Sequence, residues 1–349
     1  MRRLRRLNRR LFLCFLSDDL VMKKNNRLRL FCLKGLVVLA CGLSSEAFAA
    51  ECPSDDFATF VKAFSATSEV RHAFTASPVL KLEVAADGRN PKVIQKEIMA
   101  LGADELNVFS SKSDLILQLK LPNRLIARDQ QGAVLKIFTF THTDCWVLNR
   151  VEDWSLETVL DAQNQTTLLS ADERALRRGA MFNDLGIQAQ SDSSAQLYEA
   201  ALDSYLDGAQ KGSAEAAFAA ASISLSGQAP QLPTPKIYDL LIAASNKIAD
   251  AGIALAEFYC DEGEYDKSRS CINPQKSVAS LERAARLGSA GALVQLGESY
   301  ETGKLVPKDL PRAMACYQDA EKSEREIGAR AVARLVTQGV AASSSIHCF

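Results

Sequence analysis

The sequence has few histidines and lacks the short motifs that mark the commonest enzyme and metal sites. Only three histidines occur among its 349 residues: His72, His142 and His347. No two cysteines form a Cys-x-x-Cys pair, which argues against a redox dithiol and against the usual zinc sites. The chain also has no His-Glu-x-x-His, no glycine-rich phosphate loop and no Gly-x-Ser-x-Gly. The sequence therefore predicts no catalytic residue, no metal site and no cofactor.

One cluster of reactive side chain types does occur, at His142, Asp144 and Cys145. A Cys/His nucleophile needs the two side chains to converge. In a strand, however, His142 and Asp144 share one face while Cys145 points to the other. We therefore interpret Cys145 as half of a structural disulfide, and His72 and His347 as surface residues.

Positive charge is scarce outside the N-terminal segment. Residues 1–50 hold eleven Lys and Arg against three Asp and Glu, whereas residues 51–349 hold thirty against thirty-nine. Binding to phosphate groups needs clustered cations. The acidic main part of the chain therefore excludes nucleic acid as an expected partner.

The basic N-terminal segment has the layout of a cleaved secretory signal. Lysines and arginines at 23–34 precede a short apolar run at 35–43, and Ala47-Phe-Ala49 supplies the small residues of a cleavage site. The apolar run is about nine residues, too short for the roughly 20 that span a bilayer. We predict cleavage near Ala49 and a mature chain without a membrane span, located in the periplasm or secreted.

Two alternatives to simple cleavage remain open. The segment can stay as an N-terminal membrane anchor, or Val38-Leu-Ala-Cys41 can act as a lipobox and give a lipoprotein anchored through Cys41. Residues 1–21 precede Met22, a natural start for a signal peptide, so they can be an artefact of start-site choice.

Six cysteines follow the predicted cleavage site, and an even number in an exported chain indicates disulfides. Cys260 and Cys271 are separated by ten residues across a turn, so we expect them to pair; two free buried thiols are the alternative. Cys52–Cys145 would tie an opening helix to a final strand. Cys316–Cys348 follows by elimination and would pin the C-terminal tail.

Residues 50–157 are predicted to form an α+β domain. Four apolar residues at helical spacing, Phe57 to Phe64, indicate one helix. Strand-like runs follow at 80–84, 114–121, 134–141 and 145–154, so we expect the helix to lean on an antiparallel sheet. Residues 146–154 resemble the closing strand of α+β-roll domains of the nuclear-transport-factor-2-like kind.

A degenerate repeat occupies the C-terminal half. Ala249-Asp-Ala251-Gly-Ile-Ala-Leu255-Ala256 aligns with Ala290-Gly-Ala292-Leu-Val-Gln-Leu296-Gly297, and fainter copies begin at Gly179, Ala214 and Glu326. A period of about 35 to 41 residues indicates stacked helical hairpins. We expect a linker at 158–170, an all-α solenoid at 171–340 and a tail at 341–349.

The repeat, with Leu-Gly, a following Tyr and a later Ala-Ala pair, resembles the Sel1-like repeat. That family forms tetratricopeptide-like α-solenoids and generally serves as an adaptor for protein complexes. The resemblance implies that one face of the first helix of each hairpin lines a concave groove. In this register the face holds Asp250, Ile253, Glu257, Asp261, Val294, Glu298 and Glu301, with Glu215 and Phe218 from an earlier copy and Ile327, Arg330 and Arg334 from the last.

Three hypotheses about function follow. The first is a non-enzymatic periplasmic scaffold that binds another protein or a peptide, possibly a basic one, in the concave groove. The second is small-ligand binding or an enzymatic role for the α+β-roll domain, with the repeats as a docking arm. The third is a structural lipoprotein of the cell envelope.

Overall fold

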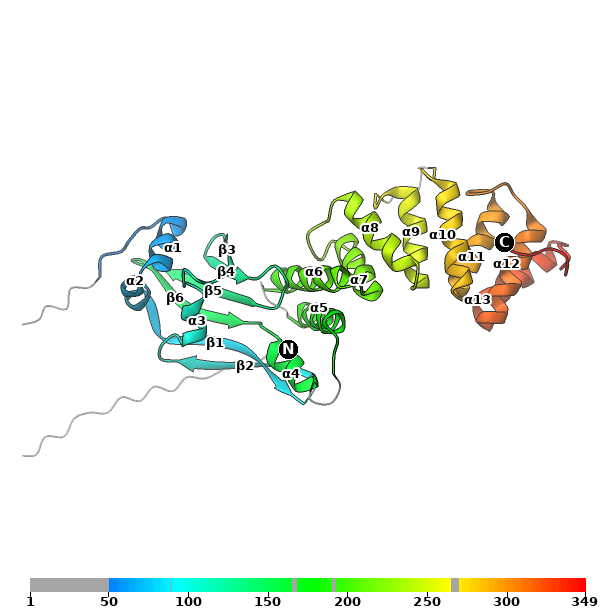
Figure 1. Ribbon diagram of the computed structural model, residues 1–349. Coiled ribbons are helices and arrows are strands. Elements are labelled where there is room, and N and C mark those ends of the chain that lie inside the picture. Colours follow the sequence, from blue (N-terminus) through cyan, green and yellow to red (C-terminus); the bar gives the residue numbers. More distant parts are fainter. Residues whose placement is uncertain (1–49, 89, 165–167, 190–192, 265–269) are drawn as a thin grey trace, which may run out of the picture. The chain divides into compact units, whose positions relative to one another are not determined.

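The computed structural model describes residues 50–88, 90–164, 168–189, 193–264 and 270–349 (Figure 1). Residues 50–349 form one compact unit. The predicted signal segment, its cleavage site and Cys41 lie outside the described residues. Within the described part, no helix has both the length and the hydrophobicity that crossing a membrane needs.

A six-stranded sheet, in the order β2-β1-β6-β5-β4-β3, forms the first half of this unit. Its strands are β1 (Thr75–Asp87), β2 (Asn90–Ile98), β3 (Ile116–Lys120), β4 (Arg124–Arg128), β5 (Leu135–His142) and β6 (Trp146–Asp153). Four of the five strand pairings are antiparallel, but β1 and β6 run parallel. The sequence analysis expected an antiparallel sheet and did not identify β2 or β4.

Helices α1 (Phe57–Ala66), α2 (Ser68–Ala73) and α3 (Ala103–Asn107) belong to the same half of the molecule. Asp56 begins α1 by accepting a hydrogen bond from the Thr59 backbone N–H at 2.9 Å. The apolar face of α1 is buried in a cluster with Phe138 and Phe140 of β5. The disulfide Cys52–Cys145 joins the segment before α1 to the start of β6, so the helix is held on this face by packing and by a covalent bond.

The other face of the sheet packs against helices α4 (Glu157–Asn164), α5 (Ala171–Gln188) and α6 (Ser194–Gln210). One buried cluster contains Ile137 of β5 and Phe182 of α5 and extends as far as Phe258. Sheet and first helices therefore share one core. The predicted division into a domain at 50–157, a linker and a solenoid remains a prediction about the chain's organisation.

Ion pairs help to hold the sheet and helices α5 and α6 together. The guanidinium of Arg178, 5% exposed, lies 3.0 Å from the Asp207 carboxylate and donates to the Gln131 carbonyl at 2.7 Å. Arg128 of β4 pairs with Glu199 and Asp203 of α6, each at 2.8 Å. Burial raises the pKa of Asp203 to about 6, because the attraction of Arg128 only partly offsets the loss of water.

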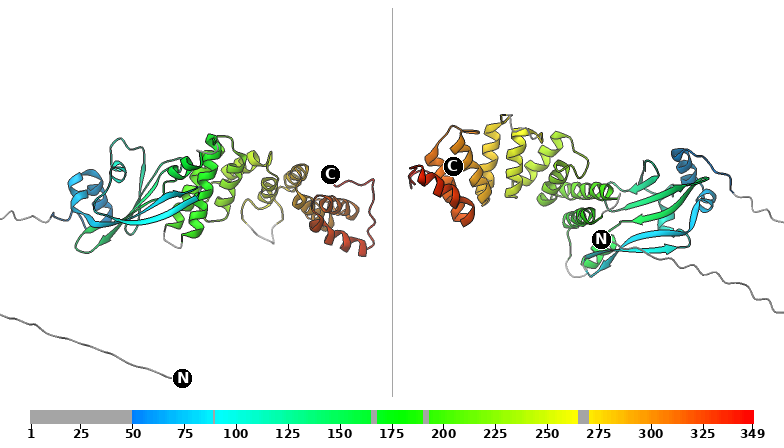
Figure 2. Two further views of the ribbon diagram at one scale, coloured as in Figure 1. Left: turned by 90° about the horizontal axis from the view of Figure 1, so that it is seen from below. Right: turned by 180° about the vertical axis from the view of Figure 1, so that it is seen from behind.

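The remaining helices follow one another as the α-solenoid that the repeat predicts (Figure 2). They are α7 (Ala214–Leu225), α8 (Thr234–Ser245), α9 (Ala249–Asp261), α10 (Pro274–Arg286), α11 (Ala290–Thr302), α12 (Leu310–Ser323) and α13 (Arg325–Thr337). Pro235, Pro274 and Pro311 lie in the first turns of α8, α10 and α12. A missing N–H costs least there, so proline marks helix starts in this chain.

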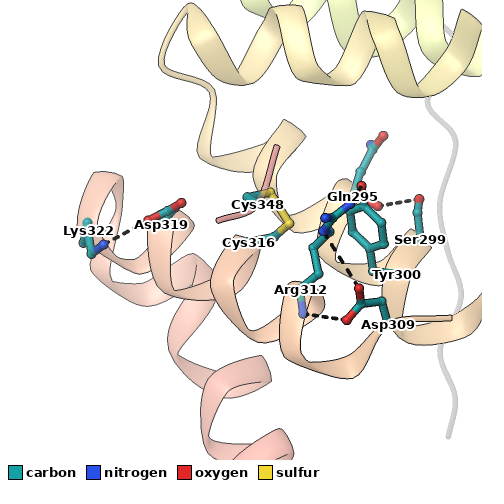
Figure 3. Close-up of a disulfide and its surroundings, with 9 residues drawn as sticks. All are labelled: Gln295, Ser299, Tyr300, Asp309, Arg312, Cys316, Asp319, Lys322 and Cys348. Atoms are coloured by element: carbon teal, nitrogen blue, oxygen red, sulfur yellow. Dashed lines mark hydrogen bonds and ion pairs between the residues drawn. A yellow bond between two sulfur atoms is a disulfide. The ribbon is translucent and has the colours of Figure 1, made fainter. Parts of the chain in front are cut away.

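The two remaining disulfides join Cys260 to Cys271 and Cys316 to Cys348. All three pairs are those that the sequence analysis expects. The first closes the longer connection between α9 and α10, part of which, residues 265–269, lies outside the described residues. The second attaches the tail to α12, beside the Arg312 side chain, which extends toward Tyr300 and Asp309 (Figure 3).

Candidate partner-binding groove

Four acidic residues of the predicted stripe line one groove of the solenoid. Glu257 and Asp261 come from α9, and Glu298 and Glu301 come from α11. The groove has a volume of about 700 Å³. Because α9 and α11 are the first helices of successive hairpins, the repeat brings their corresponding faces together.

The groove is not lined by acidic groups alone. Ala256 and Leu281 of α10, each 1% exposed, form its buried floor, and the half-buried Leu305, which follows α11, contributes apolar surface. Polar side chains also line it: Ser277, Gln295, Ser299, Thr302 and Lys304. Such a mixture can bury an apolar side chain of a ligand while acidic groups hold its cations.

One end of the groove already holds a cation from the chain itself. The Arg334 guanidinium of α13 lies 2.5 Å from the Glu301 carboxylate, which also accepts a hydrogen bond from the Tyr317 hydroxyl at 2.8 Å. Burial by itself would raise the pKa of Glu301, but the bonds from Tyr317 and Arg334 outweigh it and lower that pKa. Glu301 is therefore ionised, and its carboxylate is already paired with the Arg334 guanidinium.

The other acidic groups of the groove are available. Among the described residues, none of Glu257, Asp261 and Glu298 forms an ion pair. Glu257 only accepts a long hydrogen bond, 3.4 Å, from the Gln295 amide. Asp261 accepts the Gly263 backbone N–H at 2.9 Å, which holds its carboxylate at the end of α9. Three carboxylates without an ion pair, together with the Lys304 ammonium, thus face this groove.

Seven members of the predicted stripe lie outside the groove lining: Asp250, Ile253, Val294, Glu215, Phe218, Ile327 and Arg330. Asp250 is exposed in the first turn of α9. Ile253 and Val294 are half-buried and pack against the core cluster of the last repeats. Conversely, Gln295, Ser299 and Leu281 line the groove although the sequence did not predict them. Gln295 and Ser299 of α11 face the groove because of the angle at which the helices cross. Leu281 belongs to α10, the second helix of the hairpin. Arg334, which the register placed on the same face, does line it.

A second concavity, of about 870 Å³, lies on the α3 side of the sheet. Two of its lysines are paired: Lys81 lies 2.7 Å from Glu105, and Lys136 lies 2.6 Å from Asp153, whereas Asp104 and Lys112 also line it. Ser155 also lines it, with its hydroxyl buried and without a hydrogen-bond partner in the described structure. The cleft can accept a polar ligand, although Lys81 and Lys136 are already neutralised by their carboxylate partners.

The histidine cluster of the sequence is arranged differently from a nucleophile and its base. Cys145 is bonded to Cys52, while His142 packs edge-on against Trp146 and lies 3.5 Å from Asp55. Within the described residues, no three His, Cys, Asp or Glu side chains are grouped so that they could hold a metal ion.

No protein-family model and no curated protein matches this sequence. Among solved structures, 22 chains match. Sel1 repeat proteins are among them. One, a protective antigen of uropathogenic Escherichia coli with an SLR fold, is 17% identical with a TM-score of 0.42, and the match covers 52% of this chain but 37% of that one. Another, a Sel1 repeat protein from Oxalobacter formigenes, is 19% identical with a TM-score of 0.40, covering 54% and 77%.

In this chain, helices α7, α9 and α11 begin at Ala214, Ala249 and Ala290, where the repeated residues predict. The chain spans only about a third of the E. coli antigen that it matches. No comparison bears on the resemblance of residues 146–154 to nuclear-transport-factor-2-like domains.

Proposed function

We propose that this protein is a non-enzymatic scaffold whose Sel1-like solenoid binds a basic segment of another protein in the groove between α9 and α11. The observation that carries the proposal is the set of three carboxylates without an ion pair, Glu257, Asp261 and Glu298, in a groove that half-buried Leu305 also lines. A side chain of lysine or arginine supplies both an aliphatic stem and a cation for such a surface.

The contact of Arg334 with Glu301 supports a cationic ligand. It is an example, within the chain, of a guanidinium bound to a carboxylate of this acidic stripe, and a hydrogen bond from the Tyr317 hydroxyl orients that carboxylate. A partner that presents arginines or lysines at similar spacing would extend the same chemistry to Glu298 and Glu257.

We further propose that the protein works in the periplasm or outside the cell. The three disulfides are stable only in an oxidising compartment, and the basic segment before Ala50 has the order of a secretory signal. The signal segment and the lipidated alternative through Cys41 are tested by sequencing the N-terminus of the mature protein.

The groove is tested with three synthetic peptides of equal length, basic, neutral and acidic, each with the same leucines. We expect residues 50–349 to bind the basic peptide, with an affinity that falls as salt is raised. Glu257→Lys together with Glu298→Lys should weaken binding at low salt by about tenfold or more, because charge attraction becomes repulsion. Fluorescence anisotropy of labelled peptides measures both effects.

A matched control changes the same charge elsewhere. Asp239→Lys together with Glu326→Lys alters two exposed acidic residues that do not line the groove. If this control weakens binding as much as the groove variant, net charge alone is responsible. If neither variant changes binding, the site must be sought elsewhere.

The cleft on the sheet supports the second candidate, a small polar ligand held by the α+β half. The unpartnered Ser155 hydroxyl favours it. A ligand there would be unaffected by Glu257→Lys/Glu298→Lys and would respond to Ser155→Ala, so the two candidates are separable with the same set of variants.

A further inference from the structure

The two edges of the sheet are protected to very different degrees. An edge strand presents unpaired backbone N–H and C=O groups, and proteins usually shield it with lysines or proline. The edge strand β2 follows this practice, with Pro91, Lys92 and Lys96 along it. The other edge strand, β3, pairs with β4 on one side, and no strand in the described part of the chain pairs with its other side.

The β3 edge is apolar and exposed. Every residue of Ile116–Lys120 is exposed, and Ile116, Leu117 and Leu119 keep 43%, 39% and 38% of their surface in contact with solvent. Leu117 and Leu119 lie opposite Ala127 and Leu125 of β4, so they share the sheet face that carries the α1 core. An apolar strand edge of this kind is suited to pairing with another strand.

The sequence of this edge is complementary to itself when it is read antiparallel. If two copies meet about a two-fold axis at Leu117, Leu117 faces Leu117 of the second copy and Leu115 faces its Leu119. Asp114, which with Leu115 directly precedes β3 and would extend it on pairing, then faces Lys120, and this happens twice in the pair. Among the described residues neither Asp114 nor Lys120 has an ion-pair partner within its own chain. On the face that carries α1, leucines therefore meet leucines, while on the other face Ile116 meets Gln118 and opposite charges meet at both ends.

This complementarity identifies a second copy of the chain as the occupant. A peptide of unrelated sequence would need its own leucines and two opposite charges at matching positions, whereas a second copy supplies both by symmetry. We propose that β3 is a dimerisation edge, at which two copies pair antiparallel about Leu117 and join their six-stranded sheets into one. The dimer carries two solenoid grooves, so a partner with two basic segments would bind with avidity.

Sedimentation equilibrium of residues 50–349 over a range of concentrations tests the proposal. We expect a reversible monomer–dimer equilibrium. Leu117→Lys places two lysines directly opposite each other on the axis and should raise the dimer dissociation constant about tenfold or more. Val93→Lys, at a residue 43% exposed on the β2 edge, is the matched control and should leave the constant unchanged. A chain that stays monomeric up to its solubility limit overturns the proposal, as does a dimer that survives Leu117→Lys.

A charge exchange tests the register without touching the apolar residues. Asp114→Lys brings two pairs of like charges together and should weaken the dimer. Adding Lys120→Asp restores opposite charges at both ends and should restore association. If the double variant remains as weak as Asp114→Lys alone, the proposed pairing is wrong. Circular dichroism of each variant confirms that the fold is retained.

Discussion

At the scale of single residues, Gly297 explains why the repeat contains a glycine in its first helix. A Cβ at this position would lie 2.6 Å from Cε1 of the Tyr317 ring, closer than real contacts allow. Tyr317 is 1% exposed and its hydroxyl is held by Glu301, so the ring cannot move aside easily. The preceding repeat has Ala256 and Leu281 at the aligned positions. A larger residue in the first helix thus accompanies a smaller one in the second.

Gly297→Ala should therefore destabilise the protein, although alanine is the better helix former. Overpacking a filled core costs about 1–3 kcal/mol, whereas the gain in helix propensity is about 1 kcal/mol. We expect a net loss of up to about 2 kcal/mol in the free energy of unfolding, measured by urea denaturation.

Gly291 in the same helix is the control for that prediction. A Cβ added there would meet Ile253 at 3.4 Å, an ordinary contact. Gly291→Ala should be neutral or slightly stabilising. Equal destabilisation by both substitutions would mean that the fit against Tyr317 is not the cause.

At the scale of elements, the tail and α13 form the end of the solenoid. The Cys316–Cys348 bond closes a loop that contains α13, and Cys348 is 1% exposed within the core cluster of the last repeats. The Arg286 guanidinium lies 5.0 Å from the centre of the Phe349 ring. A terminal repeat has a neighbour on one side only, so the covalent bond replaces stabilisation that inner hairpins receive from stacking.

Removing this bond with Cys316→Ala and Cys348→Ala should loosen the last repeat selectively. The chain-entropy model gives a loss of about 3–4 kcal/mol for a loop of this length. Hydrogen exchange measured by mass spectrometry should show faster exchange in α13, while the β5 and β6 strands keep their protection. Cys260→Ala with Cys271→Ala is the control, since it opens a surface connection between α9 and α10. Unchanged exchange in α13 would show that packing alone holds it.

At the scale of the whole molecule, the sheet and the first hairpins are joined by the common core and by Arg178. Both tryptophans of the chain lie in or next to β6, so fluorescence reports on the sheet, whereas circular dichroism reports mainly on the helices. Removing the Arg178 side chain would leave the buried Asp207 carboxylate without its guanidinium partner. This would weaken the packing between the sheet and the first hairpins.

We expect thermal unfolding of the sheet and of α5 to α9 to coincide. The fluorescence midpoint should agree with the main transition seen by circular dichroism, and Arg178→Ala should lower both together. Midpoints that separate, or a variant that shifts only one of them, would show that the two halves unfold independently. The measurement also tests whether the division at residues 158–170 separates two domains.

The sequence by itself determined the elements whose signals are local. Repeated small residues, leucines and tyrosines predicted the helical hairpins; the prolines marked the starts of second helices; and phenylalanines at helical spacing predicted α1. These signals survive in the sequence because a helix face or a hairpin is specified by residues close along the chain. The acidic stripe could likewise be predicted from helix periodicity once the repeat was aligned.

Only the tertiary structure decided how distant segments meet. Strand β2 has no buried face and β4 is five residues long, so neither gives a clear alternation of burial. The parallel pairing of β1 with β6 depends on a connection that passes through four other strands. The separation of Glu257 and Glu298 from Asp250, and the occupation of Glu301 by Arg334, depend on helix crossings. These are contacts between residues far apart in the chain, and local pattern does not encode them.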